Sequence, residues 1–578
     1  MNTRTAKPLI LALLVVAVLV FPLAVTSNYW LNLVNLSISF SIACLGLNIV
    51  LGYAGQLSLA QAAFWGVGAY TSALLTTWLG WPVWPCMLIA FIVAGLFGVC
   101  LGIPTLKLTG HYLAMTTIGF GIILQLILIN AICSLLLLTW ASIRLKDSRV
   151  GRAFLAVQGN EMAAETMGID TTLYKIMAFA LSAAYGGYGG ALFAHSGSHY
   201  ISPDTFSFDQ SVVLLAMAVL GGNGSAIGAI VGATLLTLLP EVLRFLKDSY
   251  MMVYAAGIVA VMIFMPGGIA GLVKGLPFAL RLRAWWNAGS AAIRQVAVSV
   301  ATRDGVGGRP IPAKVASGAE SNGTLLSVKG LAKHFGGLKA VDGVDMEVRR
   351  GEIQALIGPN GSGKTTILNM LSGLYVPTAG EISLEGTVIT GRKPHIITAH
   401  GMARTFQNIR LFGELTVLNN VLIGQHCHSK AGLVPSVVQP ASQQAEETGM
   451  RKKALEMLEF VGLRGKEFAQ ANSLPYGQQR LLELARALAS DPKILLLDEP
   501  AAGLNANETE TLIDLLFQIR DQGITILLVE HDMSLVMNVS DHITVLNFGK
   551  KIAEGAAEAI EKNQEVIDAY LGTEVGNA

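Results

Sequence analysis

The sequence predicts a chain of two parts, an N-terminal polytopic α-helical membrane domain followed by a soluble α/β domain. Its composition is 52% hydrophobic and only 14% charged, against roughly 25% charged residues in an ordinary soluble domain. The charges are also unevenly distributed, since the only charged side chains before Arg144 are Arg4, Lys7 and Lys107. From about residue 325 onward, charged residues occur at the density of a soluble domain.

Length and charge exclude several classes of protein. A chain of 578 residues is too long for one compact core. Its 40 basic and 39 acidic residues give a net charge of +1, which offers no global reason to expect a nucleic-acid partner. Five cysteines in a chain of this length make no disulfide framework, which argues against a soluble secreted protein.

The first half contains apolar runs of the length that crosses a bilayer core of about 30 Å. A signal peptide is the alternative for the first run, but no small-residue cleavage site follows it and further spans do. The predicted spans are residues 9–26, 30–51, 57–79, 84–103, 174–194, 212–220, 227–239 and 253–269.

Basic residues set the orientation of these spans, because they favour the cytoplasmic side. They place the N-terminus, Lys107 and the loop 144–175 in the cytoplasm. Segment 111–143 lies between two of these cytoplasmic positions, yet it is too short for two spans of about 20 residues. We expect a shortened hairpin that turns near Asn130, or a segment that does not fully span; a single tilted span is the alternative.

Two glycine-rich segments lie among the spans, at residues 52–61 and 186–190. Close helix packing through small residues explains most of these glycines. For residues 52–61, a broken or re-entrant helix along a translocation path explains the sequence as well as helix packing does. This segment carries Gln56, Ser58 and Gln61 in apolar surroundings.

Residues 273–324 are predicted to be a linker. Arg281, Trp285 and Trp286 indicate a basic amphipathic stretch on the inner leaflet. Residues 301–323 are rich in Gly, Pro, Ser and Ala and are expected to be flexible.

The soluble half contains a complete G-x-x-x-x-G-K-[ST] loop between a predicted strand, 353–357, and a predicted helix, 367–374. In such a loop, backbone N–H groups surround phosphate oxygens, and the lysine pairs with the β- and γ-phosphates. The residues predicted to bind ATP here are Gly358, Pro359, Asn360, Gly361, Ser362, Gly363, Lys364, Thr365 and Thr366. The Thr365 hydroxyl is a predicted Mg²⁺ ligand.

Two further apolar strands, 494–497 and 524–529, end in acidic residues. Carboxyl ends of parallel strands are where ligands bind in open α/β sheets. Asp498 is therefore a predicted Mg²⁺ ligand, and Glu499 is predicted to polarise the attacking water. His531, after the second strand, is predicted to contact the γ-phosphate.

Together with a further loop at residues 474–478, these motifs resemble the ATPase domain of ABC transporters, in the same order along the chain. The resemblance covers about residues 325–572 and implies an α/β P-loop ABC ATPase domain. It implies that Phe335 stacks on adenine and that Gln407 lies in the Mg²⁺-sensing loop. The segment 502–505 resembles the dimer-contact loop. The implied signature loop consists of Leu474, Pro475, Tyr476, Gly477 and Gln478, with Pro475 and Tyr476 where many members have Ser and Gly.

Finer details resemble the importers of branched-chain amino acids. Segments 336–341, 403–408 and 569–572 resemble one of their two ATPases, and residues 1–272 independently resemble one of their permeases. The permease resemblance is carried by residues 52–62, 111–115, 149–153 and 220–225. The implied organisation is a permease domain (1–272), the linker (273–324), an ATPase domain (325–572) and a tail (573–578).

In such importers a short cytoplasmic helix docks into a cleft of the ATPase, and residues 150–168 resemble it. Ala163 and Ala164 permit close approach, and Gly168 can end the helix. Met162 occupies a position where the motif usually has Glu. An ordinary solvated loop is the alternative.

The resemblance implies ATP-driven import of a branched-chain or related hydrophobic amino acid, with ATP and Mg²⁺ as cofactors, in a bacterial inner membrane with the ATPase domain cytoplasmic. One phosphate loop and one signature loop cannot form both composite sites, so the implied partners are a second permease and a second ATPase, or a second copy. A periplasmic substrate-binding protein is also implied. The alternatives are an importer of another small solute such as urea or a short amide, an exporter, and a regulatory membrane ATPase.

Overall fold

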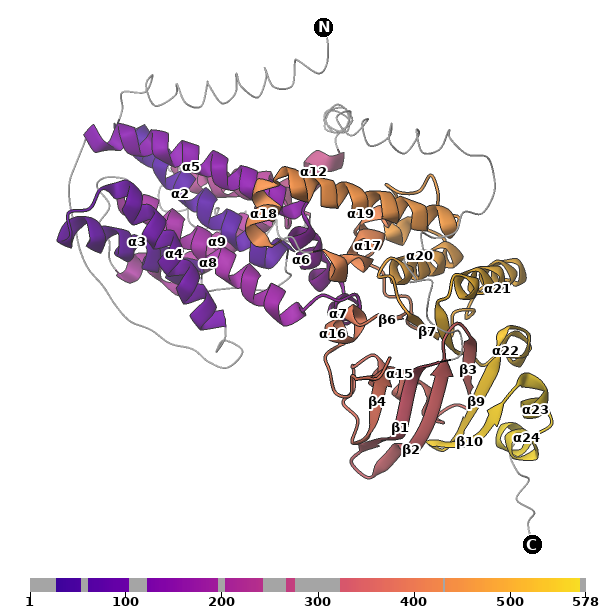
Figure 1. The fold of residues 1–578 in the computed structure, drawn as a ribbon. Coiled ribbons are helices and arrows are strands. Elements are labelled where there is room, and N and C mark those ends of the chain that lie inside the picture. The colour runs from indigo at the N-terminus through magenta and orange to yellow at the C-terminus, as the bar shows by residue number, and fades with distance from the viewer. Residues whose placement is uncertain are drawn as a thin grey trace. The chain divides into compact units, whose positions relative to one another are not determined.

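The computed structural model describes residues 28–53, 61–102, 122–195, 203–242, 267–275, 323–429 and 432–571 (Figure 1). These residues form two compact units. Unit 1 contains residues 1–158, 172–304 and 432–438, and unit 2 contains residues 159–171, 305–431 and 439–578. The predicted fold class is confirmed, since unit 1 is helical and unit 2 is α/β.

Unit 1 is built from apolar helices. The long ones are α2 (Asn28–Asn48), α3 (Gln61–Trp78), α4 (Val83–Gly102), α5 (Ile122–Lys146), α8 (Thr171–His195), α9 (Phe208–Gly221) and α10 (Ala226–Val242). The short elements are η1 (Ile49–Tyr53), α6 (Arg149–Gly159), η2 (Pro203–Phe206), α12 (Gly268–Gly275) and α18 (Leu433–Val438). The runs 9–26 and most of 253–269 lie outside the described residues, as do 54–60 and nearly all of the linker.

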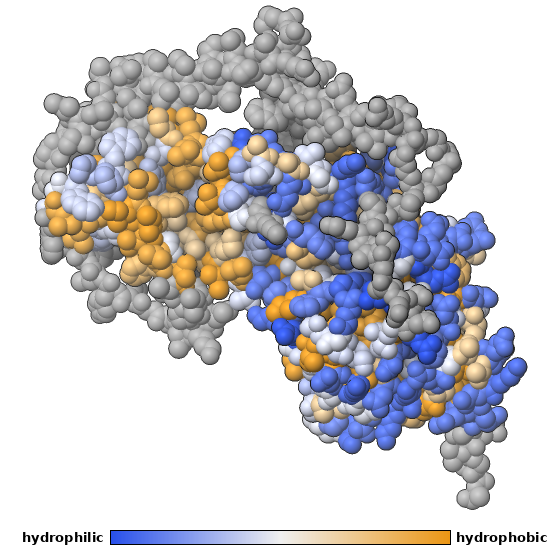
Figure 2. All heavy atoms as spheres, in the orientation of Figure 1, coloured by the Kyte–Doolittle hydropathy of each residue, from blue (hydrophilic) through white to orange (hydrophobic). Residues whose placement is uncertain are grey.

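Several of these helices expose apolar stripes rather than polar faces. Leu88, Ile92 and Leu96 of α4 are 63%, 58% and 59% exposed, and α10 has a similar stripe at Ile227, Val231 and Leu235. Figure 2 shows hydrophobic residues over the helical unit and mainly hydrophilic residues over unit 2. Among the residues that the structure describes, the helical stretches Trp30–Tyr53 and Thr171–His195 are long and apolar enough to cross a membrane. Exposed apolar stripes of this kind fit a lipid surround.

Glycines of α8 allow α3 to approach closely, as the packing interpretation predicts. A Cβ added to Gly190 would lie 1.6 Å from the carbonyl oxygen of Trp65, and one added to Gly68 would lie 1.8 Å from that of Gly187. Gln61 is fully buried and ties three helices together, donating to the carbonyl of Ala43 over 2.8 Å and accepting from the hydroxyl of Ser182 over 2.9 Å. Helix packing thus accounts for these described residues of the two glycine-rich segments.

The expected turn near Asn130 is wrong. Helix α5 runs without interruption from Ile122 to Lys146, through Asn130. The physical reason is local, because these 25 residues contain neither Gly nor Pro and nothing else in them stops a helix. Residues 103–121 lie outside the described part of the chain.

Unit 2 contains two sheets. The four-stranded antiparallel sheet has the order β2-β1-β4-β5 and the six-stranded sheet has the order β10-β9-β3-β8-β7-β6. The strands are β1 (Thr324–Phe335), β2 (Leu338–Arg349), β3 (Ile353–Ile357), β4 (Ala379–Leu384), β5 (Thr387–Val388), β6 (Met402–Arg404), β7 (Ile494–Asp498), β8 (Thr525–Val529), β9 (His542–Asn547) and β10 (Lys550–Gly555).

The helices of unit 2 cover these sheets and form a separate helical layer. They are α7 (Glu161–Thr166), α15 (Lys364–Leu371), α16 (Pro394–Ala399), α17 (Val417–Gly424), η5 (His426–His428), α19 (Ala441–Phe460), η6 (Ala471–Ser473), α20 (Tyr476–Leu488), α21 (Ala506–Asp521), α22 (Met533–Val539), α23 (Ala557–Glu561) and α24 (Gln564–Leu571). One apolar core lies between the two sheets and α15, and another joins α17, α19, α20 and α21 to β7 and β8.

Candidate functional site: a nucleotide site at the strand ends

Strands β3, β6, β7 and β8 are mutually parallel neighbours in the order β3-β8-β7-β6. Strands β3, β7 and β8 are buried along their whole length, as their uninterrupted apolar sequences predict. Since parallel strands end at one edge, four segments meet there: the glycine-rich loop after β3, the Gln407 loop after β6, Asp498–Glu499 at β7, and Glu530–His531 after β8. The predicted convergence of the site residues is therefore present.

The glycine-rich loop, residues 358–363, wraps around the ammonium group of Lys364. Its Nζ donates to the carbonyl oxygens of Gly358 over 2.6 Å and Pro359 over 2.9 Å. Burial lowers the pKa of Lys364, while the carboxylates of Glu499 and Asp498 act in the opposite direction. Helix α15 begins at this lysine, so its N-terminal N–H groups and positive end face the loop. The arrangement is suited to phosphate.

Glycine is required at the start and end of this loop. Gly358 and Gly363 have φ angles of +148° and +104°. A Cβ on Gly358 would lie 2.1 Å from the carbonyl oxygen of Leu546, and one on Gly363 would lie 2.6 Å from that of Ala340. The loop is thus packed against its own domain by backbone contacts that a side chain would prevent.

Asp498 has a partner that the sequence analysis missed. The guanidinium of Arg404, at the end of β6, lies 3.0 Å from Oδ2 of Asp498, with both side chains at most 3% exposed. Arg404 also donates to Asn369 and Ser372, at the C-terminal end of α15. Burial raises the pKa of Asp498, and the Arg404 charge opposes that shift. Arg404 therefore connects β6, β7 and the helix of the glycine-rich loop.

Glu499 contacts two of the other predicted catalytic residues. Its Oε2 accepts a hydrogen bond of 2.9 Å from Nε2 of Gln407 and lies 3.6 Å from Nδ1 of His531. The backbone of Glu499 has φ +48°, an uncommon left-handed conformation for a residue with a side chain. Strain of this kind is concentrated at functional sites. His531 is 64% exposed, whereas neighbouring Glu530 is buried, which raises the pKa of Glu530.

Phe335, predicted to stack on adenine, lies at the end of β1 and is 44% exposed. Its ring meets that of Tyr375 edge-on, with centroids 5.5 Å apart. The ammonium of Lys333 lies 5.2 Å from the Phe335 ring centroid. A half-exposed aromatic face is available for stacking.

The predicted signature loop lies at the start of α20, with Pro475 as its N-cap residue. Its Tyr476 hydroxyl lies 3.3 Å from the carbonyl oxygen of Ala502, in the segment that resembles the dimer-contact loop. A Cβ on Gly503 would lie 3.0 Å from the Tyr476 ring. The departures from the usual signature pattern thus place an aromatic ring between the two loops.

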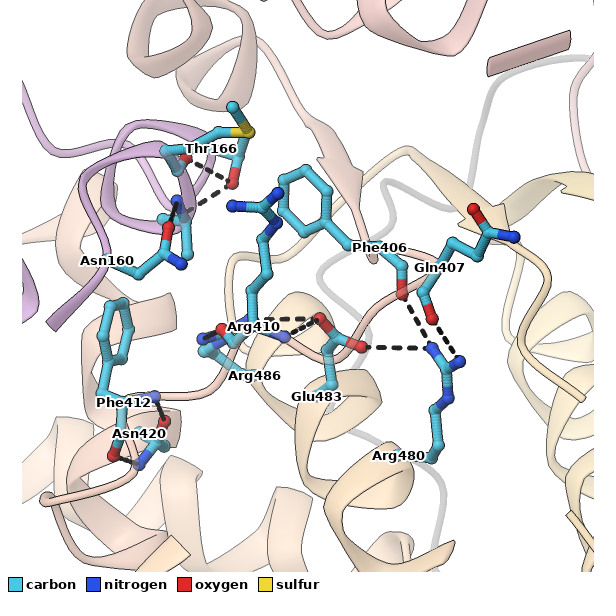
Figure 3. Close-up of polar contacts among 12 residues, drawn as sticks. Asn160, Thr166, Phe406, Gln407, Arg410, Phe412, Asn420, Arg480, Glu483 and Arg486 are labelled. Carbon is cyan, nitrogen blue, oxygen red and sulfur yellow. Dashed lines mark hydrogen bonds and ion pairs between the residues drawn. The ribbon is translucent and has the colours of Figure 1, made fainter. Parts of the chain in front are cut away.

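Of the segment predicted to dock on the ATPase, residues 159–168, which include α7, belong to unit 2 by their contacts, whereas residues 150–158 belong to unit 1 (Figures 1 and 3). Asn160 caps α7, its side chain accepting from the Ala163 N–H over 2.9 Å. Ala163 and Ala164 are completely buried. The Thr398 hydroxyl of α16 donates to the carbonyl of Thr166 over 2.9 Å.

Gly168 follows α7 at φ +84°, where a Cβ would lie 3.0 Å from that of Cys427. Met162, the residue that departs from the motif, is 39% exposed. The solvated-loop alternative does not fit this burial.

Sequence reasoning also missed three buried charges on α20, namely Arg480, Glu483 and Arg486. Their signal was present, since charged residues recur every third position on a helix whose remaining residues are largely apolar. Such a stripe normally indicates a solvated face, whereas here it faces the Gln407 loop.

Comparison with known proteins defines the class. Residues 341–502 match the ABC transporter family model, and residues 29–132 and 125–266 match that of the branched-chain amino acid transport system permease component. The chain is therefore an ABC transporter in which a permease domain is fused to an ATPase domain that couples ATP hydrolysis to transport.

The particular family follows from the ATPase half. Residues 550–576 match the branched-chain amino acid ATP-binding cassette transporter model. The chain is 47% identical over 250 residues to the high-affinity branched-chain amino acid transport ATP-binding protein BraF of Pseudomonas aeruginosa, covering 43% of this chain and 98% of BraF. It is 47% identical over 249 residues to LivG of Escherichia coli K12, with the same coverage. The chain belongs to the branched-chain amino acid ATP-binding cassette transporter family.

The two permease matches overlap at residues 125–132, within α5. The first match to the permease model therefore ends within α5, and the second match begins within the same helix. This is the segment where the sequence was found too short for two crossings.

Proposed function

We propose that the chain imports branched-chain or closely related hydrophobic amino acids, driven by ATP, as a fused permease–ATPase subunit in a bacterial inner membrane with the ATPase domain cytoplasmic. The observation that carries this proposal is that two independent halves match one transport system. The burial of Ala163 and Ala164 in unit 2 supports it, because an importer of this kind needs a helix that transmits movement from the ATPase.

Mg²⁺ is the proposed metal. Thr365, Asp498 and Gln407 would hold it through a hydroxyl, a carboxylate and an amide oxygen, which are ligands that Mg²⁺ prefers. Gln407 contacts Glu499 through its amide nitrogen, which leaves its amide oxygen to serve as the metal ligand. When bound, Mg²⁺ neutralises charge that develops on the transferred phosphoryl group.

The protein's own residues supply the remaining steps. Lys364 pairs with the β- and γ-phosphates, and Phe335 stacks on the base. Glu499 orients and deprotonates the attacking water, with Gln407 holding its carboxylate in place over 2.9 Å. His531, beside the same carboxylate, contacts the γ-phosphate.

The proposed assembly contains a second permease and a second ATPase, or a second copy of this chain. The signature loop of one ATPase domain would face the glycine-rich loop of the other, giving two composite sites. A periplasmic substrate-binding protein would deliver the amino acid.

The test is reconstitution of the full chain in proteoliposomes, with uptake of labelled leucine and ATP hydrolysis measured with and without a branched-chain amino acid binding protein. We expect uptake that requires ATP and the binding protein, and none with the Glu499→Gln variant. Uptake of labelled urea or acetamide in place of leucine would identify the other solute class. ATP hydrolysis without any uptake would contradict transport.

A further inference from the structure

Arg480, Glu483 and Arg486 are buried together on one face of α20 and form what we call the α20 charge cluster. Their side chains are 5%, 1% and 0% exposed. The glutamate lies 3.7 Å from Nη1 of Arg480 and 3.5 Å from Nη2 of Arg486. Burial raises the pKa of Glu483, and the two guanidinium groups oppose that shift. Since a buried ion cluster is a poor means of stabilising a fold, its contacts indicate a more specific role.

Each member of the cluster binds backbone atoms of the Gln loop, residues 405–416, which connects β6 to α17 (Figure 3). Its first arginine donates to the carbonyl oxygens of Phe406, over 2.7 Å, and Gln407. Its second arginine donates to the carbonyl of Arg410 over 2.7 Å. The Arg410 N–H donates to the glutamate over 3.3 Å. The cluster therefore supplies hydrogen-bond partners for backbone groups of Phe406, Gln407 and Arg410, which lie in no helix or strand.

One end of the Gln loop lies in the nucleotide site. Gln407 donates to Glu499 over 2.9 Å, and its own carbonyl is held by Arg480. Arg480 also donates to the hydroxyl of Tyr476 over 3.1 Å. The cluster thus contacts both Gln407, the partner of Glu499, and Tyr476 of the signature loop.

The other end of the Gln loop lies against the α7 segment, residues 159–171. The guanidinium of Arg486 lies 5.0 Å from the ring centroid of Phe412. A Cβ on Gly159 would lie 3.3 Å from Cδ1 of that ring. Asn420 fixes the backbone of Phe412 by accepting from its N–H over 3.0 Å and donating to its carbonyl over 3.1 Å.

We propose that Glu483 is a positioning residue: by holding Arg480 and Arg486 against the Gln loop, it keeps Gln407 at the nucleotide site and Phe412 at the α7 segment in one rigid arrangement. The proposal rests on the proposed function of α7 as a transmitting helix. Glu483 pairs with Arg480, Arg486 and the Arg410 N–H, so it acts through the loop. Its removal loosens the docking of the α7 segment without removing the site that binds ATP.

The test uses the full chain, with its native cysteines replaced and new cysteines at Asp170 and His395, whose side chains lie 3.7 Å apart in unit 2. A short bis-maleimide cross-links this pair when the α7 segment is docked. Three chains are compared: the pair alone, the pair with Glu483→Gln, and the pair with Glu459→Gln. Glu459 is 51% exposed in an ion pair with Arg464 and serves as the matched control. Binding of labelled ATP is measured on each.

We expect Glu483→Gln to lower the cross-linking yield several-fold with ATP affinity unchanged, and Glu459→Gln to change neither. An unchanged yield in Glu483→Gln would overturn the proposal. Loss of ATP binding in that variant would overturn it too, because the carboxylate would then support the whole domain rather than the loop. Absence of cross-linking in the pair alone would contradict the docking of α7 itself, and the inference with it.

Discussion

Arg404 and Asp498 form a buried ion pair, 3.0 Å between Nη2 and Oδ2, at the ends of adjacent strands β6 and β7. The carboxylate predicted to hold Mg²⁺ is thus already oriented by a cation of the same domain. Because Arg404 is also anchored on Asn369 and Ser372, the carboxylate is fixed relative to the helix of the glycine-rich loop.

Arg404→Met is expected to destabilise the ATPase domain strongly, because it leaves Asp498 buried without its partner. Breaking such a pair costs about 3–5 kcal/mol. The control is Arg350→Gln, which removes a pair with Glu385 whose side chains are both 30% exposed and which should cost about 1 kcal/mol or less. Urea unfolding of the fragment 323–578 measures the loss of stability in both variants. This fragment corresponds to the ATP-binding relatives, which are separate chains. Equal losses in the two variants would contradict the structural role of Arg404.

Glu499→Gln is expected to slow hydrolysis by about 10²–10⁴-fold, the usual cost of losing a positioned general base. ATP binding should remain, because Lys364 and Asp498 are unchanged. Single-turnover hydrolysis and binding of labelled ATP separate the two effects. Glu510→Gln, an exposed change on α21, is the control and should retain full activity. Turnover within a few-fold of the parent would remove Glu499 from the role of base.

Lys364→Ala is expected to weaken ATP binding itself. The substitution removes the buried ammonium that the loop carbonyls of Gly358 and Pro359 hold in position. Equilibrium binding of ATP to the full chain measures the effect, and AMP is the matched ligand, since it lacks the β- and γ-phosphates that Lys364 would contact. An unchanged preference for ATP over AMP would contradict the assignment.

Replacing Ala163 and Ala164 with glutamate is expected to uncouple hydrolysis from uptake. Both side chains are fully buried in unit 2, so larger charged groups cannot be accommodated without undocking α7. Met162→Glu, at a position that is 39% exposed, is the control and should transport normally. The measured quantity is leucine taken up per ATP hydrolysed. A normal ratio in the double variant would show that α7 does not transmit movement.

The parts of the site that could be predicted from sequence are those with a local signal. Asp498, Glu499 and His531 follow apolar strands, and parallel strands bring their ends together whatever the rest of the chain does. Arg404 has no such signal, and the spacing of Glu483 with Arg480 and Arg486 on α20 normally indicates a solvated face. Each pairs with a residue of another segment or binds a distant loop, and a charged side chain is ordinarily taken to be exposed.

The error at Asn130 has the opposite origin. The prediction of a turn rests on the parity of the flanking cytoplasmic loops, which is a non-local argument. The local sequence from Ile122 to Lys146 has no helix-breaking residue, and the helix continues. Backbone conformation followed the local sequence here.

Helix α5 therefore leads to a different topology from the hairpin. At about 1.5 Å per residue, its 25 residues extend for roughly 37 Å, enough to cross a core of about 30 Å once. Its last turn carries Arg144 and Lys146, which favour the cytoplasmic side. A single crossing then places the start of α5, at Ile122, on the opposite face.

We expect cysteines introduced at positions 122 and 146, the two ends of α5, to be labelled by a membrane-impermeant maleimide from opposite sides, and a cysteine at Asn130 to be protected from both. Position 146 should react only in inside-out vesicles, because the basic residues in the last turn of α5 favour the cytoplasmic side. Labelling of 122 and 146 from the same side would contradict a single crossing by α5. Reaction at 130 from the outside would restore the hairpin.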